Sequence, residues 1–155
     1  MGAPSMVLNS PVANKAPRLV FCNRSATRGG VDAAWLPGSN NLGAELPDLL
    51  AVIGSMIGEV RRVVYDPRSW TKTPSRMIRR GVAISIDPYP MVTCETIYLI
   101  GTHSRDAVIY VFPQTCTTAI VDRVLDAIRD SDAPMDTSVL RHLLGRFSTA
   151  EAETA

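Results

Sequence analysis

The sequence predicts an α+β fold: a single curved antiparallel sheet of about six or seven strands with two or three amphipathic helices. Short stretches rich in Val, Ile and Tyr recur between turn-forming residues, as in strands. A few longer stretches place apolar residues three and four positions apart, which is the spacing of one helical face. The two kinds of stretch do not alternate regularly, so repeated βαβ units are not indicated.

The composition is typical of a globular domain. The chain has 155 residues, of which 46% are hydrophobic and 20% charged, with a net charge of +1. A chain of this size buries roughly 68–70% of its unfolded surface. No apolar run approaches the roughly 18 residues that cross a bilayer, so we expect no membrane partner. Residues 1–17 lack the apolar core of a signal peptide and the three cysteines form no C-x-x-C pair, so we expect a cytoplasmic protein with reduced thiols.

Four parts of the chain are expected. Residues 1–17 are predicted to be a disordered lead-in, and residues 18–133 to form a single α+β domain. Residues 134–147 are predicted to form a C-terminal amphipathic helix, because Asp136 is suited to capping a helix and an apolar stripe follows it in the sequence. Residues 148–155 are predicted to be a disordered tail.

The strands are predicted from alternating or β-branched segments that end at glycine or proline. The first two segments flank a Gly-Gly turn, and we expect them to pair as a hairpin. Two later pairs are joined at Gly81 and at the turn HSRD, and a separate strand ends at Pro67. The predicted strands are 18–25, 31–36, 59–66, 77–80, 82–86, 96–102 and 107–112.

The helix after the second strand has the clearest pattern. Its apolar stripe consists of Leu42, Leu46, Leu49, Leu50, Ile53, Met56 and Ile57. Asn40 or Asn41 is suited to capping its start, and Pro47 is expected to begin the regular helix after an initial turn. A second amphipathic helix is predicted after Thr117 or Thr118, closed by Pro134.

Residues 32–47 carry the order D-x-A-W-x-P-x-S-x-x-L-x-x-E-L-P. This order resembles the hallmark of an actinobacterial family of small uncharacterised proteins, a domain of unknown function. Further points of resemblance are Val60-x-Arg62-Val63-x-Tyr65, Trp70, Pro74 and Val111-x-Pro113, so the resemblance extends over roughly 18–133. It implies a shared fold and carries over no activity, cofactor or site residue.

Catalytic and cofactor-binding patterns are weak. A nucleophile needs a nearby base, and nothing in the spacing requires Cys94 or Cys116 to meet His103. His142 lies in the C-terminal helix region. Neither a metal-ligand spacing nor a glycine-rich phosphate loop is present. We therefore expect no metal and no cofactor, and favour a non-enzymatic protein.

Several residues are candidates for contacts with a ligand or partner. Trp35 is expected to anchor the core, and Asp32 is the residue of its segment with the least evident structural role. The arginine-rich region 61–80, together with an aromatic ring, could hold a phosphate backbone and a stacked base. The candidates are Asp32, Trp35, Trp70, Arg61, Arg62, Arg79 and Arg80.

The leading hypothesis is a non-enzymatic protein-interaction or regulatory module that binds another protein through an exposed sheet face or the terminal helix. Nucleic-acid binding through residues 61–80 and a small enzyme of unknown reaction are the alternatives. The sequence indicates no oligomeric state.

Overall fold

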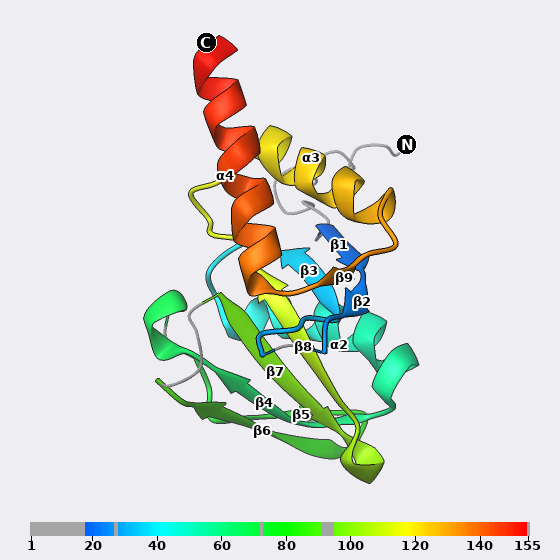
Figure 1. Ribbon diagram of the computed structural model, residues 1–155. Coiled ribbons are helices and arrows are strands. Elements are labelled where there is room, and N and C mark those ends of the chain that lie inside the picture. The colour runs from blue at the N-terminus through cyan, green and yellow to red at the C-terminus, as the bar shows by residue number, and fades with distance from the viewer. Residues whose placement is uncertain (1–17, 27, 72, 91–94, 155) are drawn as a thin grey trace, which may run out of the picture.

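The computed structural model describes residues 18–26, 28–71, 73–90 and 95–154, which form a mixed sheet with helices on both faces (Figure 1). Within these residues the sheet has seven strands, in the order β1 (Arg18–Phe21), β3 (Ala33–Leu36), β8 (Asp106–Val111), β7 (Thr96–Gly101), β4 (Val60–Tyr65), β6 (Val82–Pro88) and β5 (Arg76–Arg79). A second, small sheet pairs β2 (Asn23–Arg24) with β9 (Pro134–Met135). The helices are α2 (Leu42–Ile57), α3 (Thr118–Arg129) and α4 (Thr137–Thr154), with short 3-10 turns η2 (Pro67–Ser69) and η3 (Thr102–Ser104). The predicted α+β class with about seven strands is confirmed.

The strand pairing is mostly antiparallel, with two parallel contacts in the main sheet. The predicted hairpin partners β1–β3, β5–β6 and β7–β8 are antiparallel neighbours. The pairs β3–β8 and β4–β6 are parallel, which differs from the expected purely antiparallel sheet. Parallel neighbours need a crossover connection: the chain passes from β4 to β6 through η2 and β5, and from β3 to β8 through the elements from α2 to β7. As a result β3, β8, β4 and β6 all run in the same direction.

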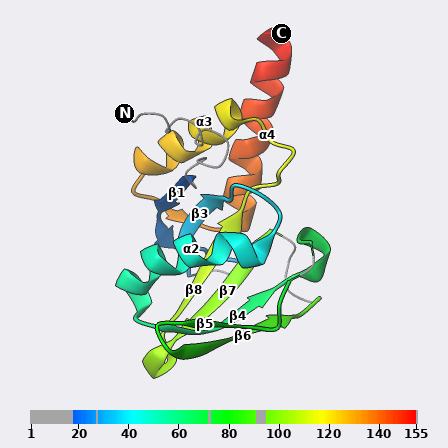
Figure 2. The ribbon, with the colours of Figure 1, turned by 180° about the vertical axis from the view of Figure 1, so that it is seen from behind.

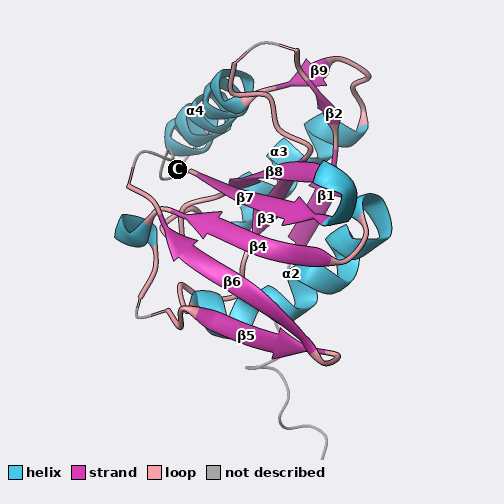
Figure 3. Ribbon diagram, turned by 90° about the horizontal axis from the view of Figure 1, so that it is seen from below, coloured by secondary structure: helices cyan, strands magenta, loops and turns pink. Residues whose placement is uncertain are grey.

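Two hydrophobic cores lie on opposite faces of the sheet. The helix α2 covers one face, where Trp35, Leu46 and Ile97 are fully buried (Figure 2). The helices α3 and α4 pack on the other face over β1, β3 and β8, where Tyr110 and Phe112 meet in an edge-to-face contact at 5.3 Å. Among the described residues, no helix lies in front of the opposite face of β7, β4 and β6 (Figure 3).

The helix α2 is continuous from Leu42 to Ile57. Asn41 is its N-cap, because its side chain accepts a hydrogen bond from the Ala44 backbone N–H at 3.2 Å. Pro47 lies in the second turn and not at the start of a separate helix, as the sequence suggested. Since proline lacks an N–H, the Gly43 carbonyl four residues earlier loses that hydrogen bond, and tertiary packing of the apolar stripe compensates for it.

The C-terminal helix is later and longer than predicted. Residues 134 and 135 form β9, and α4 begins at Thr137 after Asp136, whose side chain accepts from the Val139 backbone N–H at 2.9 Å. The helix continues to Thr154, through most of the segment expected to be a disordered tail, and its end projects beyond α3 (Figure 1). The predicted lead-in, 1–17, lies outside the described residues. No helix in the described ranges has the length and apolar character to cross a membrane.

Candidate functional site

The four strands that run in the same direction all stop at proline. Pro37, Pro67 and Pro113 follow β3, β4 and β8 within two residues, and Pro88 is the last residue of β6. Proline has no N–H for the strand ladder, so these strands end together at one edge of the sheet. The loops that leave this edge are therefore brought side by side.

A cavity of about 270 Å³ lies at this edge, and we call it the Trp70 pocket. Its walls are mainly apolar, and they combine the indole of Trp70 and the ring of Phe112 with proline and valine side chains. Serine, amide and carboxylate groups complete the lining. The lining residues are Pro37, Ser39, Asn40, Ser69, Trp70, Glu95, Val111, Phe112, Pro113 and Gln114.

The loop on one side of the pocket is held by the first turns of α2. The carboxylate of Glu45 accepts hydrogen bonds from the Gly38 backbone N–H at 2.9 Å and from the Ser39 hydroxyl at 2.8 Å. The Asn40 carbonyl accepts from both the backbone N–H and the hydroxyl of Thr71, at 2.9 and 3.1 Å. These bonds join the loop after β3 to the segment that carries Trp70, so the pocket is formed before any ligand binds.

The two tryptophans occupy different positions in the fold. Trp35 is fully buried and stacks on Trp70, with ring centroids 5.9 Å apart and planes 27° apart. Its indole N–H has no hydrogen-bond partner among the described residues. Trp70 is partly buried and lines the pocket. The Trp35 ring is therefore the support for Trp70, which is the residue accessible to a ligand.

Glu95 supplies the acidic group of the pocket, and it is already paired. Its Oε1 accepts hydrogen bonds from Nε and Nη2 of Arg141 on α4, at 2.8 and 2.5 Å, and its Oε2 accepts from the same Nε at 2.9 Å. The Tyr110 hydroxyl lies 3.4 Å from the same carboxylate. Burial raises the pKa of Tyr110 above its ordinary value, and the neighbouring Glu95 carboxylate adds to the rise. The tyrosine is consequently a neutral donor, and the arginine compensates the charge of Glu95.

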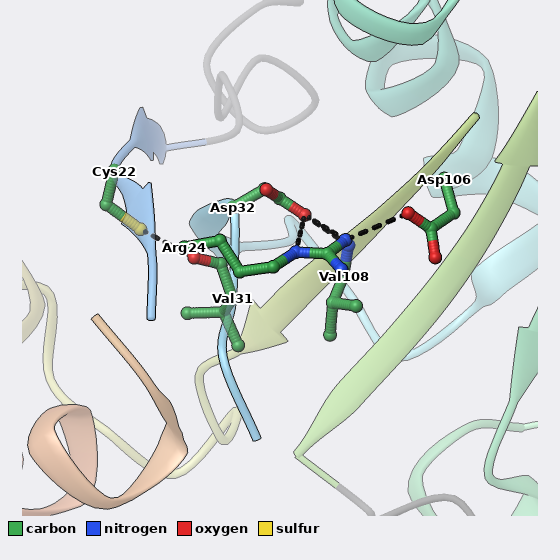
Figure 4. Close-up of polar contacts among 6 residues, drawn as sticks. All are labelled: Cys22, Arg24, Val31, Asp32, Asp106 and Val108. Carbon is green, nitrogen blue, oxygen red and sulfur yellow. Dashed lines mark hydrogen bonds and ion pairs between the residues drawn. The ribbon is translucent and has the colours of Figure 1, made fainter. Parts of the chain in front are cut away.

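Asp32 lies immediately before β3, at the other end of this strand from the Trp70 pocket, and its carboxylate is paired with Arg24 (Figure 4). Its Oδ2 accepts from Arg24 Nε and Nη2, at 3.0 and 2.7 Å, and from the Val108 backbone N–H at 2.8 Å. Arg24 also reaches Asp106 at 3.1 Å. The backbone N–H of Asp32 donates to the Val108 carbonyl at 2.7 Å. The residue thus extends the parallel pairing of β3 with β8, a role that local sequence patterns do not reveal.

Cys22 lies near Asp32. Its thiol donates to the Val31 carbonyl at 3.4 Å (Figure 4). Burial, reinforced by the charge of Asp32, raises the pKa of the Cys22 thiol to about 12. The thiol is protonated at neutral pH and is a poor nucleophile.

The candidate arginines do not share one surface. Arg62 pairs with Asp87 at 2.7 Å, and Arg61 lies 3.8 Å from Glu59. Arg62 is paired with residue 85 of β6, and Arg79 is paired with residue 82 of the same strand. Positions 82 and 85 are an odd number of residues apart, so the side chains of the two arginines lie on opposite faces of the sheet. Arg79 and Arg80 line a hollow beside the C-terminal half of α2, where cations favour the negative end of the helix dipole.

The side chains considered for catalysis are also separated. His103 lies in η3, before β8, and Cys116 lies beyond the other end of that strand. Burial raises the pKa of the Cys116 thiol. His142 is on α4, and Cys94 lies outside the described residues. Among the described residues no group of three or more His, Cys, Asp or Glu side chains is arranged to hold a metal ion.

Sequence reasoning found Trp70 but missed the groups that surround it. Glu95 and Phe112 flank β7 and β8, and Arg141 is one of several cations on α4. The recurrence of proline immediately after strands that run in the same direction is the sequence signal that could have located this edge.

Comparison with protein families identifies residues 18–128 as a match to a family of unknown function, DUF5994. The chain belongs to this family, which confirms the resemblance to a domain of unknown function. The search of curated proteins and the search of solved structures gave no match.

Proposed function

We propose that this DUF5994 domain is a non-enzymatic protein-interaction module whose Trp70 pocket receives an apolar side chain of a partner protein. The observation that carries the proposal is the combination of small volume, apolar walls and a polar surround in a preformed cavity. Such pockets receive the anchor residues that contribute most of the binding energy at protein interfaces.

The size of the cavity favours a side chain over a whole ligand. Pockets that enclose drug-sized molecules or cofactors measure roughly 300–1,000 Å³. At about 270 Å³, the Trp70 pocket is below that range. It can hold the ring or branched end of one residue while the rest of the partner lies on the surface around it.

The polar groups around the pocket suit a peptide segment. The Gln114 amide donates to the Pro37 carbonyl at 3.2 Å, which leaves its side-chain oxygen as an acceptor. Ser39, Asn40 and Ser69 also border the cavity. Groups of this kind can hydrogen-bond the backbone of a bound segment, while the aromatic walls enclose its side chain.

The described pocket contacts support binding over catalysis. The one carboxylate in the lining is paired with Arg141, so it is poorly placed to act as a general base. The nucleic-acid alternative gains less support, because the arginines proposed for it lie on two faces and two of them are near acidic partners.

The uncovered sheet face offers a second surface for the same partner. Tyr98 of β7 and Ile78 of β5 are 41% and 62% exposed. Tyr98 alternates with Leu99, which is buried against α2, so its side chain is on the face that has no helix (Figure 3). An exposed aromatic beside the Arg62–Asp87 pair is typical of an interface surface.

Nuclear magnetic resonance on the intact chain tests the pocket. The chain has two tryptophans, so its indole N–H signals can be assigned with a Trp70→Phe variant. We expect the N-acetyl amides of tryptophan, phenylalanine or leucine to shift the Trp70 signal, and those of aspartate and lysine to leave it unchanged.

A filling variant provides the matched comparison. Asn40→Trp places an indole at the cavity while keeping the backbone carbonyl that binds Thr71. It should abolish the shifts, whereas Ala119→Trp, at an exposed position of α3 outside the lining, should preserve them. Equal shifts in the filled variant, or no response to any apolar amide, would refute the proposal. Peptides selected from a random display library on the wild type and counter-selected on Asn40→Trp would then define the anchor residue.

A further inference from the structure

A groove along α3 and α4 forms a second surface, separate from the Trp70 pocket. It has a volume of about 740 Å³ and is lined mainly by α4, with Arg123 contributed by α3. Arg141, His142, Arg146 and Phe147 contribute its other charged and aromatic groups. We call it the Phe147 groove. Most of its lining lies beyond residue 128, where the family match ends.

Two of the three arginines that line the groove have no acidic partner among the described side chains. No Asp or Glu is present in its described lining. The nearby acids on α3 have other partners, because Asp122 pairs with Arg18 and Asp126 with Arg129, both at 2.7 Å. Among the described side chains, which end at residue 150, neither Arg123 nor Arg146 has a carboxylate within ion-pair distance.

Phe147 positions these two arginines. The guanidinium carbons of Arg123 and Arg146 lie 5.8 and 5.9 Å from the centre of its ring. Both distances are within the range of cation–π interactions. The ring is itself partly buried against the core formed by α3 and α4. Two guanidinium groups are therefore held by a fixed aromatic ring, and their N–H donors remain available for an anion.

We infer that the Phe147 groove is a binding site for an acidic peptide segment, in which Asp or Glu carboxylates pair with Arg123 and Arg146. Guanidinium groups bind carboxylates through two parallel hydrogen bonds, and arginines held in advance lose less side-chain entropy on binding. The lining extends along α4 from Arg141 to Ala150, and the volume of about 740 Å³ is larger than the space needed by a single ion, which suits a chain segment.

An acidic peptide fits the charge pattern better than a nucleic acid does. The phosphate backbone of a nucleic acid needs cations along its length, because the affinity of a protein for it grows with the number of phosphates that the protein neutralises. Here Arg123 and Arg146, the two arginines without acidic partners among the described side chains, lie on α3 and α4, and only Arg123 shares its helix with the exposed side chains of Asp122 and Asp126. Two cations without acidic partners are too few for an extended phosphate backbone, whereas a short acidic segment can place its charges on those two arginines.

Fluorescence anisotropy on the full chain tests the inference. The probes are a labelled oligoglutamate peptide, oligoglutamine and oligolysine peptides of the same length, and a single-stranded oligodeoxynucleotide, all at low salt. We expect oligoglutamate to bind and the glutamine peptide not to bind. The Arg123→Gln/Arg146→Gln variant should lose about tenfold or more in affinity, because charge-assisted hydrogen bonds to both arginines are removed.

Arg129→Gln is the control on the same helix as Arg123, because it removes one positive charge from an exposed, already paired arginine. It should change the affinity less than about twofold. The Arg123→Glu/Arg146→Glu variant should bind oligolysine in place of oligoglutamate, which a variant that failed to fold could not do. Equal loss in the Arg129 control, retention of oligoglutamate binding in the Glu variant, or a stronger response to the oligonucleotide would overturn the inference. The Asn40→Trp variant fills the Trp70 pocket and leaves Arg123 and Arg146 in place, so it should still bind oligoglutamate, and the groove is tested whether or not the pocket receives a side chain.

Discussion

Replacing Asp32 by alanine tests how the parallel pairing of β3 and β8 is stabilised. The side chain is 13% exposed, and its Oδ2 accepts from the Val108 backbone N–H as well as from Arg24. Leaving the buried N–H without an acceptor costs about 1–3 kcal/mol. The Arg24 pair adds about 0–1 kcal/mol, because the arginine is 36% exposed and solvent screens the interaction. We therefore expect Asp32→Ala to lower the free energy of unfolding by about 1–4 kcal/mol.

Two comparison variants separate these contributions. Asp32→Asn keeps an oxygen that can accept from Val108 and should cost about 1 kcal/mol or less. Asp87→Ala removes an exposed carboxylate paired with Arg62 and should cost about 0–1 kcal/mol. Urea unfolding followed by circular dichroism measures all three, and for a chain of this size each kcal/mol corresponds to roughly 2–4 °C in Tm. If Asp32→Ala costs no more than Asp87→Ala, or no more than Asp32→Asn, the assigned role of the Val108 hydrogen bond is wrong.

Further predictions concern a buried acid, a thiol and a turn. Hydrogen bonds from Arg68 lower the pKa of Asp66. The charged Asp66 carboxylate therefore stabilises the fold fully above about pH 4, the ordinary pKa of an aspartate, and this stabilisation is lost as the pH falls through the lowered pKa. The stability difference between wild type and Asp66→Asn in urea unfolding should therefore be constant from about pH 5 to 7 and shrink below about pH 4; a difference independent of pH would contradict this. In a background lacking the other cysteines, Cys22 should react with iodoacetamide at pH 8 at least about tenfold more slowly in the folded than in the unfolded chain, as measured by mass spectrometry. Arg80 has φ of 54° in the β5–β6 turn, so Arg80→Gly should raise the unfolding free energy by about 0.5–1 kcal/mol, and a decrease would indicate that the arginine side chain stabilises the fold.

Local patterns were sufficient to predict the strands of the main sheet, the existence of the three helices and the hairpins. The stripe from Leu42 to Ile57 matches α2, and the turns at Gly81 and at HSRD connect strands that pair as expected. The parallel pairs β3–β8 and β4–β6 could not be predicted in this way, because they join segments far apart in the sequence and periodicity carries no information about which strands are neighbours.

The candidate site was predictable to a similar degree. Trp35 and Trp70 are distinctive in the sequence, but their stacking depends on the chain path through α2 and β4. Asp32 lacked an evident role because its partners, Arg24 and Val108, are set by tertiary structure. The Phe147 groove was missed for the same reason, since an amphipathic stripe on α4 does not reveal which cations of α3 lie opposite.

Arg141 belongs to both surfaces described above. It pairs with Glu95 in the lining of the Trp70 pocket, and it also lines the Phe147 groove on α4. A carboxylate that binds in the groove and draws on Arg141 therefore weakens its hold on Glu95 and makes the pocket more negative. By thermodynamic linkage, any factor by which groove binding changes the affinity of the pocket is also the factor by which pocket binding changes the affinity of the groove. One arginine thus connects the two surfaces, and the coupling free energy between them can be measured by titrating one site with the other filled.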